Sequence, residues 1–246
     1  MNGLGIVAAL VAESRPLGIA SRRGAEPATL ADGTQLIVSG VGPAAAAVGA
    51  RRLLAAGARA LLSWGLAGGL DPSLEAGALV LPREVMSPEG RMFPTSPAWR
   101  ERVSEALATR HGVRCGRLLT CREPLSSTAA KALAFRQTGA VAADMESSAV
   151  AEVAAAGRVP FLVIRAIVDT AQEDVPEVAL SATRAGEDGP RFDRLLATLA
   201  RRPGELPALV RLASRYRAAS RALAAVAVSG ALAREVSREL SRTVCL

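Results

Sequence analysis

Short apolar runs recur along the chain and are separated by stretches with helical periodicity. The runs are rich in Val, Ile, Leu and Ala, which is typical of strands buried on both faces of a parallel sheet. They predict strands within LGIVAAL (Leu4–Leu10), QLIVSG (Gln35–Gly40), ALLSWG (Ala60–Gly65), GALVLP (Gly77–Pro82), CGRLLT (Cys115–Thr120), AVAADM (Ala140–Met145) and PFLVIRAIVD (Pro160–Asp169).

Helices are predicted between these strands from their start and stop signals. Proline at the first helical position, Ser caps and a terminal glycine bound most of them. The expected helices run from Pro43 to Gly57, from Pro97 after its cap Ser96 to near Gly112, from Ser126 or Ser127 to Gly139, and from Ser147 to Ala156. Strands alternating with helices predict an α/β fold, a mostly parallel central sheet flanked by helices on both faces.

The pattern changes after Glu173. A polar connector with Pro and Gly, QEDVPEVALSATRAGEDGP, leads into helical sequence that is interrupted by RRPGELP. We therefore predict a catalytic domain over residues 1–190 and an arginine-rich helical C-terminal extension over residues 191–246.

Positive charge is concentrated in that extension. The whole chain has a formal net charge of +7, and residues 191–246 alone hold eleven arginines against four acidic residues. An anionic partner would therefore dock on the extension. A basic nucleic-acid-binding protein is one alternative. However, the rest of the chain is close to neutral and aromatic residues are only 3% of the total, so few side chains can stack on bases and we expect no nucleic-acid partner.

Several common site types lack their residues. The three cysteines form no CxxC pair, and His111 is the only histidine, so neither a zinc site nor a Ser-His-Asp triad is predicted. GLAGGL is not GxGxxG and no Walker lysine follows it. We expect no metal and no cofactor. The apolar start lacks a basic n-region, and no run reaches the roughly 20 apolar residues of a spanning helix, so a cytoplasmic protein is expected.

Acidic residues follow three of the predicted strands. Glu13 lies just past the first strand, Asp144 and Glu146 lie at the end of AVAADM, and Asp169 ends PFLVIRAIVD. We expect these acids at one edge of the sheet, together with WGLAGGL, whose Gly68 would let backbone amides approach a ligand. Taken singly, each has a simpler explanation: a helix-dipole partner, a solvated acid, a cap or a tight turn.

Five segments in this order resemble the nucleoside phosphorylase and nucleosidase family, in particular its methylthioadenosine/adenosylhomocysteine nucleosidase branch. They are GIVAALVAES, SGVGPAAAAVGA, WGLAGGLDPSLEAGALVLP, AADMESSAVAEVA and PFLVIRAIVDTA, and they span roughly residues 3–175. The resemblance implies a three-layer fold with a mixed, mostly parallel sheet, and a homo-oligomer. It also implies cleavage of the N-glycosidic bond of an adenine nucleoside.

Matching positions imply roles for individual residues. Met145 would pack on the ribose, and Glu146, rather than Asp144, would accept hydrogen bonds from the ribose hydroxyls. Asp169 matches the acid that serves purine N7, and Glu13 matches the nucleosidase residue that activates water. Arg165 lies where the family has an arginine near the nucleophile.

The chain also departs from the family pattern. Leu66 replaces a frequent Ser, and Ser63 lies where some phosphorylases have a phosphate-binding arginine. Pro124 lies where nucleosidases place an aromatic over adenine, which leaves the Leu125 backbone as the expected base contact. With Glu13 present, hydrolysis is favoured over phosphorolysis. A phosphate site built from Arg15, Arg22 or Arg165 stays an alternative.

The extension is similar to the arginine-rich tail of a hopanoid-associated branch of the family. That resemblance implies release of adenine from adenosylhopane, a lipid-linked nucleoside. In the extension, the apolar residues Leu206, Leu209, Val210, Leu212 and Ala213 are expected on one side of a helix, with arginines around the other. Such a helix suits the inner membrane surface. A helix that covers the core or an oligomer interface is an equal alternative.

Overall fold

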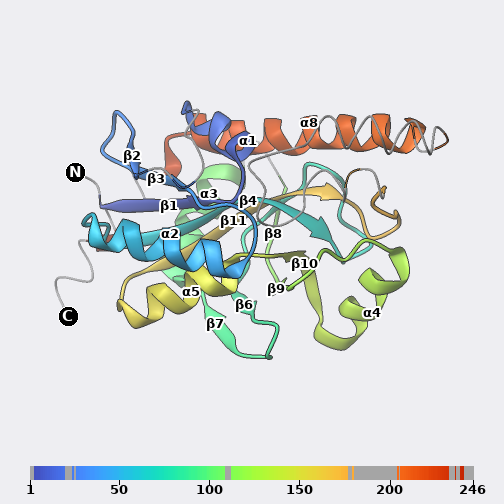
Figure 1. Ribbon diagram of the computed structural model, residues 1–246, viewed down its shortest axis with the longest axis horizontal. Helices are drawn as coiled ribbons and strands as arrows, with labels where there is room; N and C mark the ends of the chain where they lie inside the picture. Colours follow the sequence, from blue (N-terminus) through green and yellow to red (C-terminus); the bar gives the residue numbers. More distant parts are fainter. Residues whose placement is uncertain are drawn as a thin grey trace.

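The computed structural model places most of the chain in one body (Figure 1). It describes residues 3–19, 24, 26–108, 112–176, 179, 204, 206–232, 236 and 239–240. Arg22, His111 and most of the predicted connector lie outside the described residues.

The described residues form one mixed sheet of eleven strands. The strands are β1 (Leu4–Ala8), β2 (Ala28–Thr29), β3 (Gln35–Val38), β4 (Ala60–Gly69), β5 (Leu79–Val80), β6 (Glu84–Met86), β7 (Met92–Pro94), β8 (Val113–Arg114), β9 (Arg117–Thr120), β10 (Ala140–Asp144) and β11 (Phe161–Asp169). Their order is β2-β3-β1-β4-β10-β9-β6-β7, with β11 paired to β4 and β5, and β8 paired to β5. The predicted α/β fold with a mostly parallel sheet is confirmed.

Strand β4 organises the centre of this sheet. One of its edges pairs along its length with β11, in parallel. The other edge pairs first with β1, in parallel up to Trp64, and then with β10, antiparallel at Gly68 and Gly69. The carboxyl ends of β1 and β10 therefore point toward each other across the middle of β4. Ligands in open α/β sheets bind where strand connections diverge in this way.

Helices cover both faces of the sheet. They are α1 (Val11–Ser14), α2 (Pro43–Ala55), α3 (Pro97–Ala108), α4 (Thr128–Thr138), α5 (Ser147–Ala156) and α8 (Leu206–Val228), with the short 3₁₀ helix η1 (Arg15–Leu17). In Figure 1, α2 and α5 lie together on one side of the sheet, and α8 runs along the other. Two hydrophobic clusters fill these layers, one between the sheet and α2 and α5, the other between the sheet and α3 and α8.

The predicted caps account for several helix ends. Pro43 opens α2, and Ser127 caps α4 by accepting a hydrogen bond from the Ala130 amide. Gly139 ends α4 with a φ of 64°, a left-handed conformation that glycine adopts without strain. In α3, Trp99, Val103 and Leu107 are all buried, as their spacing predicts.

The second half of α8 and several described residues beyond it contribute to the core. Ala219, Ala222, Leu223 and Val226 of α8 are buried in the cluster that also holds β1, β4 and β11 residues. Beyond α8, Leu232, Val236 and Leu240 join the same cluster. The sequence left two alternatives for this segment, a membrane-surface helix and a helix that covers the core. The half of α8 that holds Ala219 to Val226 covers the core.

Strand β4 is longer than the sequence predicts. The GLAGGL segment was expected to be a loop, yet β4 continues to Gly69 because β10 and β11 occupy both of its edges there. Glycines allow this close three-strand packing: a Cβ on Gly69 would lie 3.3 Å from Ile167 Cγ2 and from the Asp169 carbonyl oxygen. The short strands β2, β6, β7 and β8 were not predicted.

Candidate active site

Glu13 lies one turn past β1 and is 4% exposed. Its Oε2 accepts hydrogen bonds from the Ala9 and Leu10 amides, both at 3.0 Å. Its Oε1 accepts a third from the Leu66 amide, at 2.9 Å, on β4. The explanation of Glu13 as a solvated loop acid is therefore wrong, because three backbone groups hold its carboxylate inside the protein.

Glu146 lies two residues after the end of β10 and is also buried, with 6% exposure. It occupies the cap position of α5 but makes no side-chain cap hydrogen bond there. Instead, its Oε1 accepts a hydrogen bond of 2.9 Å from the Gly42 amide, at the start of α2. The positive end of a helix favours a carboxylate, and here that helix is α2 rather than the helix that Glu146 precedes.

Arg165 is the cation at the centre of this group. It lies in β11 beside Gly65 of β4 and is 1% exposed. Its Nη2 atom lies 2.6 Å from Asp144 Oδ2 and 3.8 Å from Glu146 Oε2. The same nitrogen donates to the hydroxyl of Ser63 at 2.9 Å. The guanidinium is thus held mainly by Asp144, while Glu146 lies at the margin of its reach.

Asp144 is held by three partners within the protein. Besides Arg165, it accepts a hydrogen bond from the Thr120 hydroxyl at 2.9 Å, and from the Ser147 amide at 3.1 Å. Ser147 in turn donates its hydroxyl to Ser63 at 2.9 Å. Asp144 therefore anchors Arg165.

The side chains of Glu13 and Arg165 both lie against the backbone of Gly65. A Cβ at this position would lie 2.5 Å from Arg165 Nη1 and 2.5 Å from Glu13 Oε1. No side chain fits at such distances, so only glycine lets the carboxylate and the guanidinium converge over β4.

Burial and charge act against each other in this cluster. Burial raises the pKa of Glu146 to about 7, although Arg165 opposes this, and Asp144 adds to it. Burial also raises the pKa of Glu13, again opposed by Arg165 and by the three backbone amides. The carboxylates of Glu13, Asp144 and Glu146 thus lie near a single guanidinium. A buried carboxylate whose charge is only partly balanced binds a proton more readily, so its pKa rises.

Asp169 belongs to a second group of residues at the end of β11, and β4 separates β11 from β10. Gly68 of β4 lies between them, paired to Ala143 on one edge and to Asp169 on the other. A Cβ on Gly68 would lie 3.1 Å from Asp169 Oδ2. Gly68 therefore gives room to Asp169. The expectation that it lies in an open loop is wrong, because Gly68 belongs to β4.

Lys131 of α4 pairs with Asp169. Its Nζ lies 2.6 Å from Asp169 Oδ2, and the lysine is completely buried while the aspartate side chain is 14% exposed. Burial raises the pKa of Asp169, whereas Lys131 and, to a smaller extent, Arg215 lower it. Arg215 reaches this region from α8 by pairing with Glu173. Arg215 was predicted only as one of the arginines opposite the apolar side of this helix, and its pairing with Glu173 was not foreseen.

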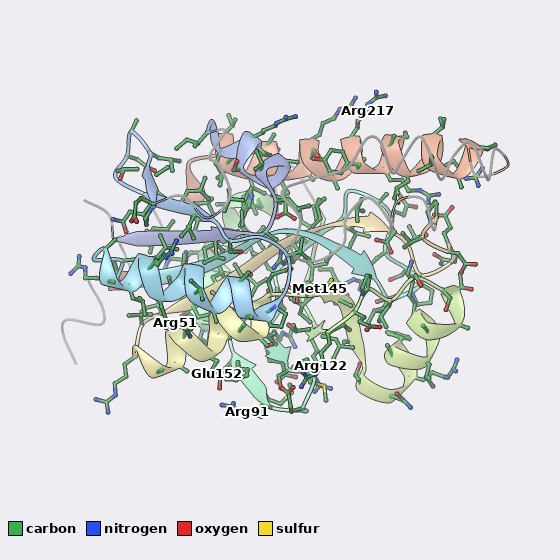
Figure 2. All side chains as sticks on the ribbon, viewed as in Figure 1. Arg51, Arg91, Arg122, Met145, Glu152 and Arg217 are labelled. Carbon is green, nitrogen blue, oxygen red and sulfur yellow. The ribbon has the colours of Figure 1, made fainter. Side chains whose placement is uncertain are left out.

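The remaining predicted contacts lie on neighbouring loops. Met145 is half-buried between Asp144 and Glu146, and Figure 2 labels it beside the end of β10. Leu125 is half-buried and packs against the small cluster formed by Leu70, Ala134, Ala140 and Ala143. Pro124 is exposed.

The structure thus brings Glu13, Glu146 and Arg165 together and places Asp169 further along β11. The prediction that the acids lie at one edge of the sheet is wrong, because the carboxyl ends of β1 and β10 meet inside the sheet, beside the middle of β4. Arg15, an alternative phosphate ligand, is exposed on η1. Sequence reasoning missed Lys131, and it noted Ser63 without its link to Arg165.

This arrangement can be compared with known proteins. A family model described as the phosphorylase superfamily matches residues 30–201. The chain belongs to the phosphorylase superfamily. The match includes β4 and β11, which carry Gly65 and Arg165, and the start of α5, where Glu146 lies.

Solved structures of this superfamily's nucleosidases share the fold. The 5′-methylthioadenosine/S-adenosylhomocysteine nucleosidase of Neisseria meningitidis, in complex with methylthio-immucillin-A, aligns with a TM-score of 0.69 at 18% identity, over 94% of this chain and 98% of its own. The Helicobacter pylori nucleosidase with butyl-thio-DADMe-Immucillin-A gives 0.60 at 21% identity, over 69% and 86%. Futalosine hydrolase of Helicobacter pylori gives 0.60 at 22%, over 69% and 85%.

Proposed function

We propose that this protein is an N-glycosidase that hydrolyses the bond between ribose and adenine in an adenosine-type nucleoside. The observation that carries the proposal is the convergence of Glu13 and Arg165 over Gly65, with Glu146 beside them. In this proposal, Glu13 activates water, Glu146 binds the ribose hydroxyls, and Asp169 protonates the purine.

The chemistry calls for these groups. When the bond breaks, positive charge develops on the sugar and negative charge on the base, so carboxylates at the ribose and a proton donor at the purine act where charge appears. Water adds to the sugar carbon and gives a proton to Glu13. The electron pair of the broken bond goes to the base, which takes the proton of Asp169. The raised pKa of Asp169 supports that role, because a donor must hold its proton near neutral pH.

Water is the nucleophile that this site favours over phosphate. Arg165 is already bound by Asp144 at 2.6 Å and by Ser63 at 2.9 Å. The Arg165 guanidinium therefore has little capacity left to bind a phosphate dianion. The dianion would also be repelled by the nearby carboxylates of Glu13 and Glu146. Like charges at such distances in a buried site are strongly unfavourable.

The substrate contacts follow from the same arrangement. Met145 is half-buried beside Glu146, which supports packing against the sugar. Leu125 precedes α4, the helix that carries Lys131, so its backbone is suited to hold the base near Asp169. Gly68 leaves space at Asp169 for the purine.

We further infer a lipid-linked nucleoside such as adenosylhopane as the natural substrate. The resemblance of the arginine-rich extension to the hopanoid-associated branch supports this. So does the first half of α8, where Val210 is 62% exposed and Arg211 and Arg217 are exposed nearby. Figure 2 shows Arg217 pointing away from the sheet. Such residues suit contact with an anionic membrane surface. The described residues contain no helix that is long and apolar enough to cross a membrane. The family resemblance also supports a cytoplasmic homo-oligomer.

The test is direct. The full chain is incubated with methylthioadenosine, adenosylhomocysteine and adenosylhopane, and free adenine is measured by mass spectrometry. Release from at least one, lost in Glu13→Gln, supports the proposal. No release from any of them would contradict it. For the membrane contact, sedimentation with acidic vesicles that falls with salt is expected, and equal sedimentation with neutral vesicles would argue against it.

A further inference from the structure

Lys131 is the only lysine in the chain, and it is completely buried. Charged side chains are seldom fully buried unless they are paired. Lys131 lies in the first half of α4, between Ala130 and Ala132, and its side chain leaves the helix toward the end of β11.

All three acceptors of the Lys131 ammonium lie in one short segment. Nζ lies 2.6 Å from Asp169 Oδ2, and it donates to the Thr170 carbonyl oxygen at 2.8 Å and to the Glu173 carbonyl oxygen at 2.7 Å. An ammonium group has three N–H donors, so every donor is used. One side chain thus fixes both the carboxyl group of Asp169 and the backbone turn that follows it.

We propose that Lys131 is a positioning residue for purine protonation, which orients the Asp169 carboxyl group and stabilises the anion that Asp169 becomes. This inference rests on the proposed function. As the glycosidic bond breaks, the proton of Asp169 passes to the purine nitrogen and a carboxylate remains. A fixed ammonium at 2.6 Å offsets that new charge without any rearrangement.

Among the described residues, the charged groups around Asp169 come from α4, α8 and the loop after β11. Lys131 projects from α4, Arg215 from α8, and Glu173 and Asp174 belong to the loop after β11. On the β4 side, Asp169 adjoins only Gly68 and Gly69. Lys131 is the largest influence that lowers the pKa of Asp169. Its removal therefore raises that pKa, and the alkaline limb of the activity profile moves to higher pH.

A lysine that merely ties α4 to the loop would behave differently. Its loss would lower stability or total activity without moving the limb that reports on Asp169. The test compares Lys131→Met with Lys131→Arg and with Arg136→Met, a control that removes an exposed cation from the same helix. Folding of each variant is checked by thermal unfolding.

We expect Lys131→Met to lower kcat at least about tenfold with a smaller change in KM, which is less than the roughly 10²-fold loss expected when the general acid itself is removed. The alkaline limb moves up by about one pH unit or more, as expected when an opposite charge within hydrogen-bonding distance is lost. Lys131→Arg keeps the limb in place and restores part of kcat, because the charge stays while the planar group fits three acceptors less well. Arg136→Met matches the wild type.

Three results would overturn the proposal: a wild-type kcat in Lys131→Met, an unshifted limb with equal losses in the Met and Arg variants, or, where Lys131→Met does not fold, an alkaline limb that moves in Lys131→Arg although the charge is kept. Titration of Asp169 by carbon-13 NMR in the full chain gives a readout that needs no activity. An unchanged Asp169 pKa in the Met variant contradicts the inference even if the wild type releases no adenine, which would be the separate failure of the proposed function.

Discussion

Arg165 of β11 and Asp144 of β10 form a buried ion pair across β4, which lies between the two strands, with 2.6 Å between Nη2 and Oδ2 and side-chain exposures of 1% and 0%. This pair fixes the only guanidinium that the described residues place among Glu13, Asp144 and Glu146. Glu146 Oε2 lies 3.8 Å from the same Arg165 nitrogen. At this distance the guanidinium still attracts the Glu146 carboxylate, which stays free to bind another group. The two acids of the DME segment therefore have different tasks, one anchoring and one facing the site.

The first prediction concerns that anchor. Asp144→Asn keeps the shape but leaves Arg165 without its counter-ion, so the free energy of unfolding should fall by about 3–5 kcal/mol. Glu84→Gln is the matched control, because it breaks a pair with Arg117 whose side chains are 37% and 35% exposed and is worth about 1 kcal/mol or less. Urea unfolding measures both. Equal losses in the two variants would mean that the buried pair does not anchor the site.

The second prediction follows from the raised pKa of Glu146, about 7 in the folded protein against an ordinary value of 4.5. Between these values the folded state keeps a proton that the unfolded state releases, so the free energy of unfolding falls as pH rises from about 4.5 to about 7. In Glu146→Gln this slope should be shallower. Denaturant titrations every half pH unit measure it, and identical slopes in both proteins would remove Glu146 as its source.

The same group should shape activity. Because the ionised carboxylate is proposed to accept the ribose hydroxyls, kcat/KM should decline as pH falls below about 7. Glu146→Gln should also lose much of the preference for ribonucleosides over 2′-deoxynucleosides. A variant that is slower on both substrates by the same factor would point to a structural role at the start of α5 instead.

The third prediction is that Asp169→Asn folds but loses adenine release by at least roughly 10²-fold in kcat, the range of general acid catalysis. An amide resembles the carboxyl group in shape but cannot give a proton to the purine. Steady-state kinetics at neutral pH measure the loss. Turnover at the wild-type rate would exclude Asp169 from the mechanism.

Much of the fold could be read from the sequence because its signals are local. The apolar runs around Leu62 and Ile164 and the caps at Pro43 and Ser127 depend only on neighbouring residues. The antiparallel placement of β10 beside β4 depends on contacts between segments more than 70 residues apart, which no local pattern encodes. Short edge strands such as β8 have too few residues to show a period.

Part of the candidate site could be predicted, because acidic residues lie at or just after the ends of predicted strands. Glu13 and Glu146 follow strands and Asp169 ends one, so their gathering near strand ends could be expected, but their place within the sheet could not. Lys131 could not be assigned in this way, since a lysine within a helix is usually solvated. A signal existed, because the single lysine of the chain lies in the apolar run AAKALAF, but its partner is 38 residues away in the sequence.

The fourth prediction separates the two halves of α8. Leu223 is 1% exposed in the core, so Leu223→Ala should lower the free energy of unfolding by about 2–5 kcal/mol. Val210→Ala, at an exposed position of the same helix, should stay within about 0.5 kcal/mol. Thermal or urea unfolding measures both. Similar small effects at the two positions would mean that α8 does not pack on the sheet.

Attack of water on the ribose can be measured in oxygen-18 water containing excess inorganic phosphate, with the sugar product identified by mass spectrometry. We expect a free sugar that carries one heavy oxygen, and loss of that product in Glu13→Gln. A ribose 1-phosphate product without the heavy oxygen would contradict this expectation, and would assign Arg165 to phosphate.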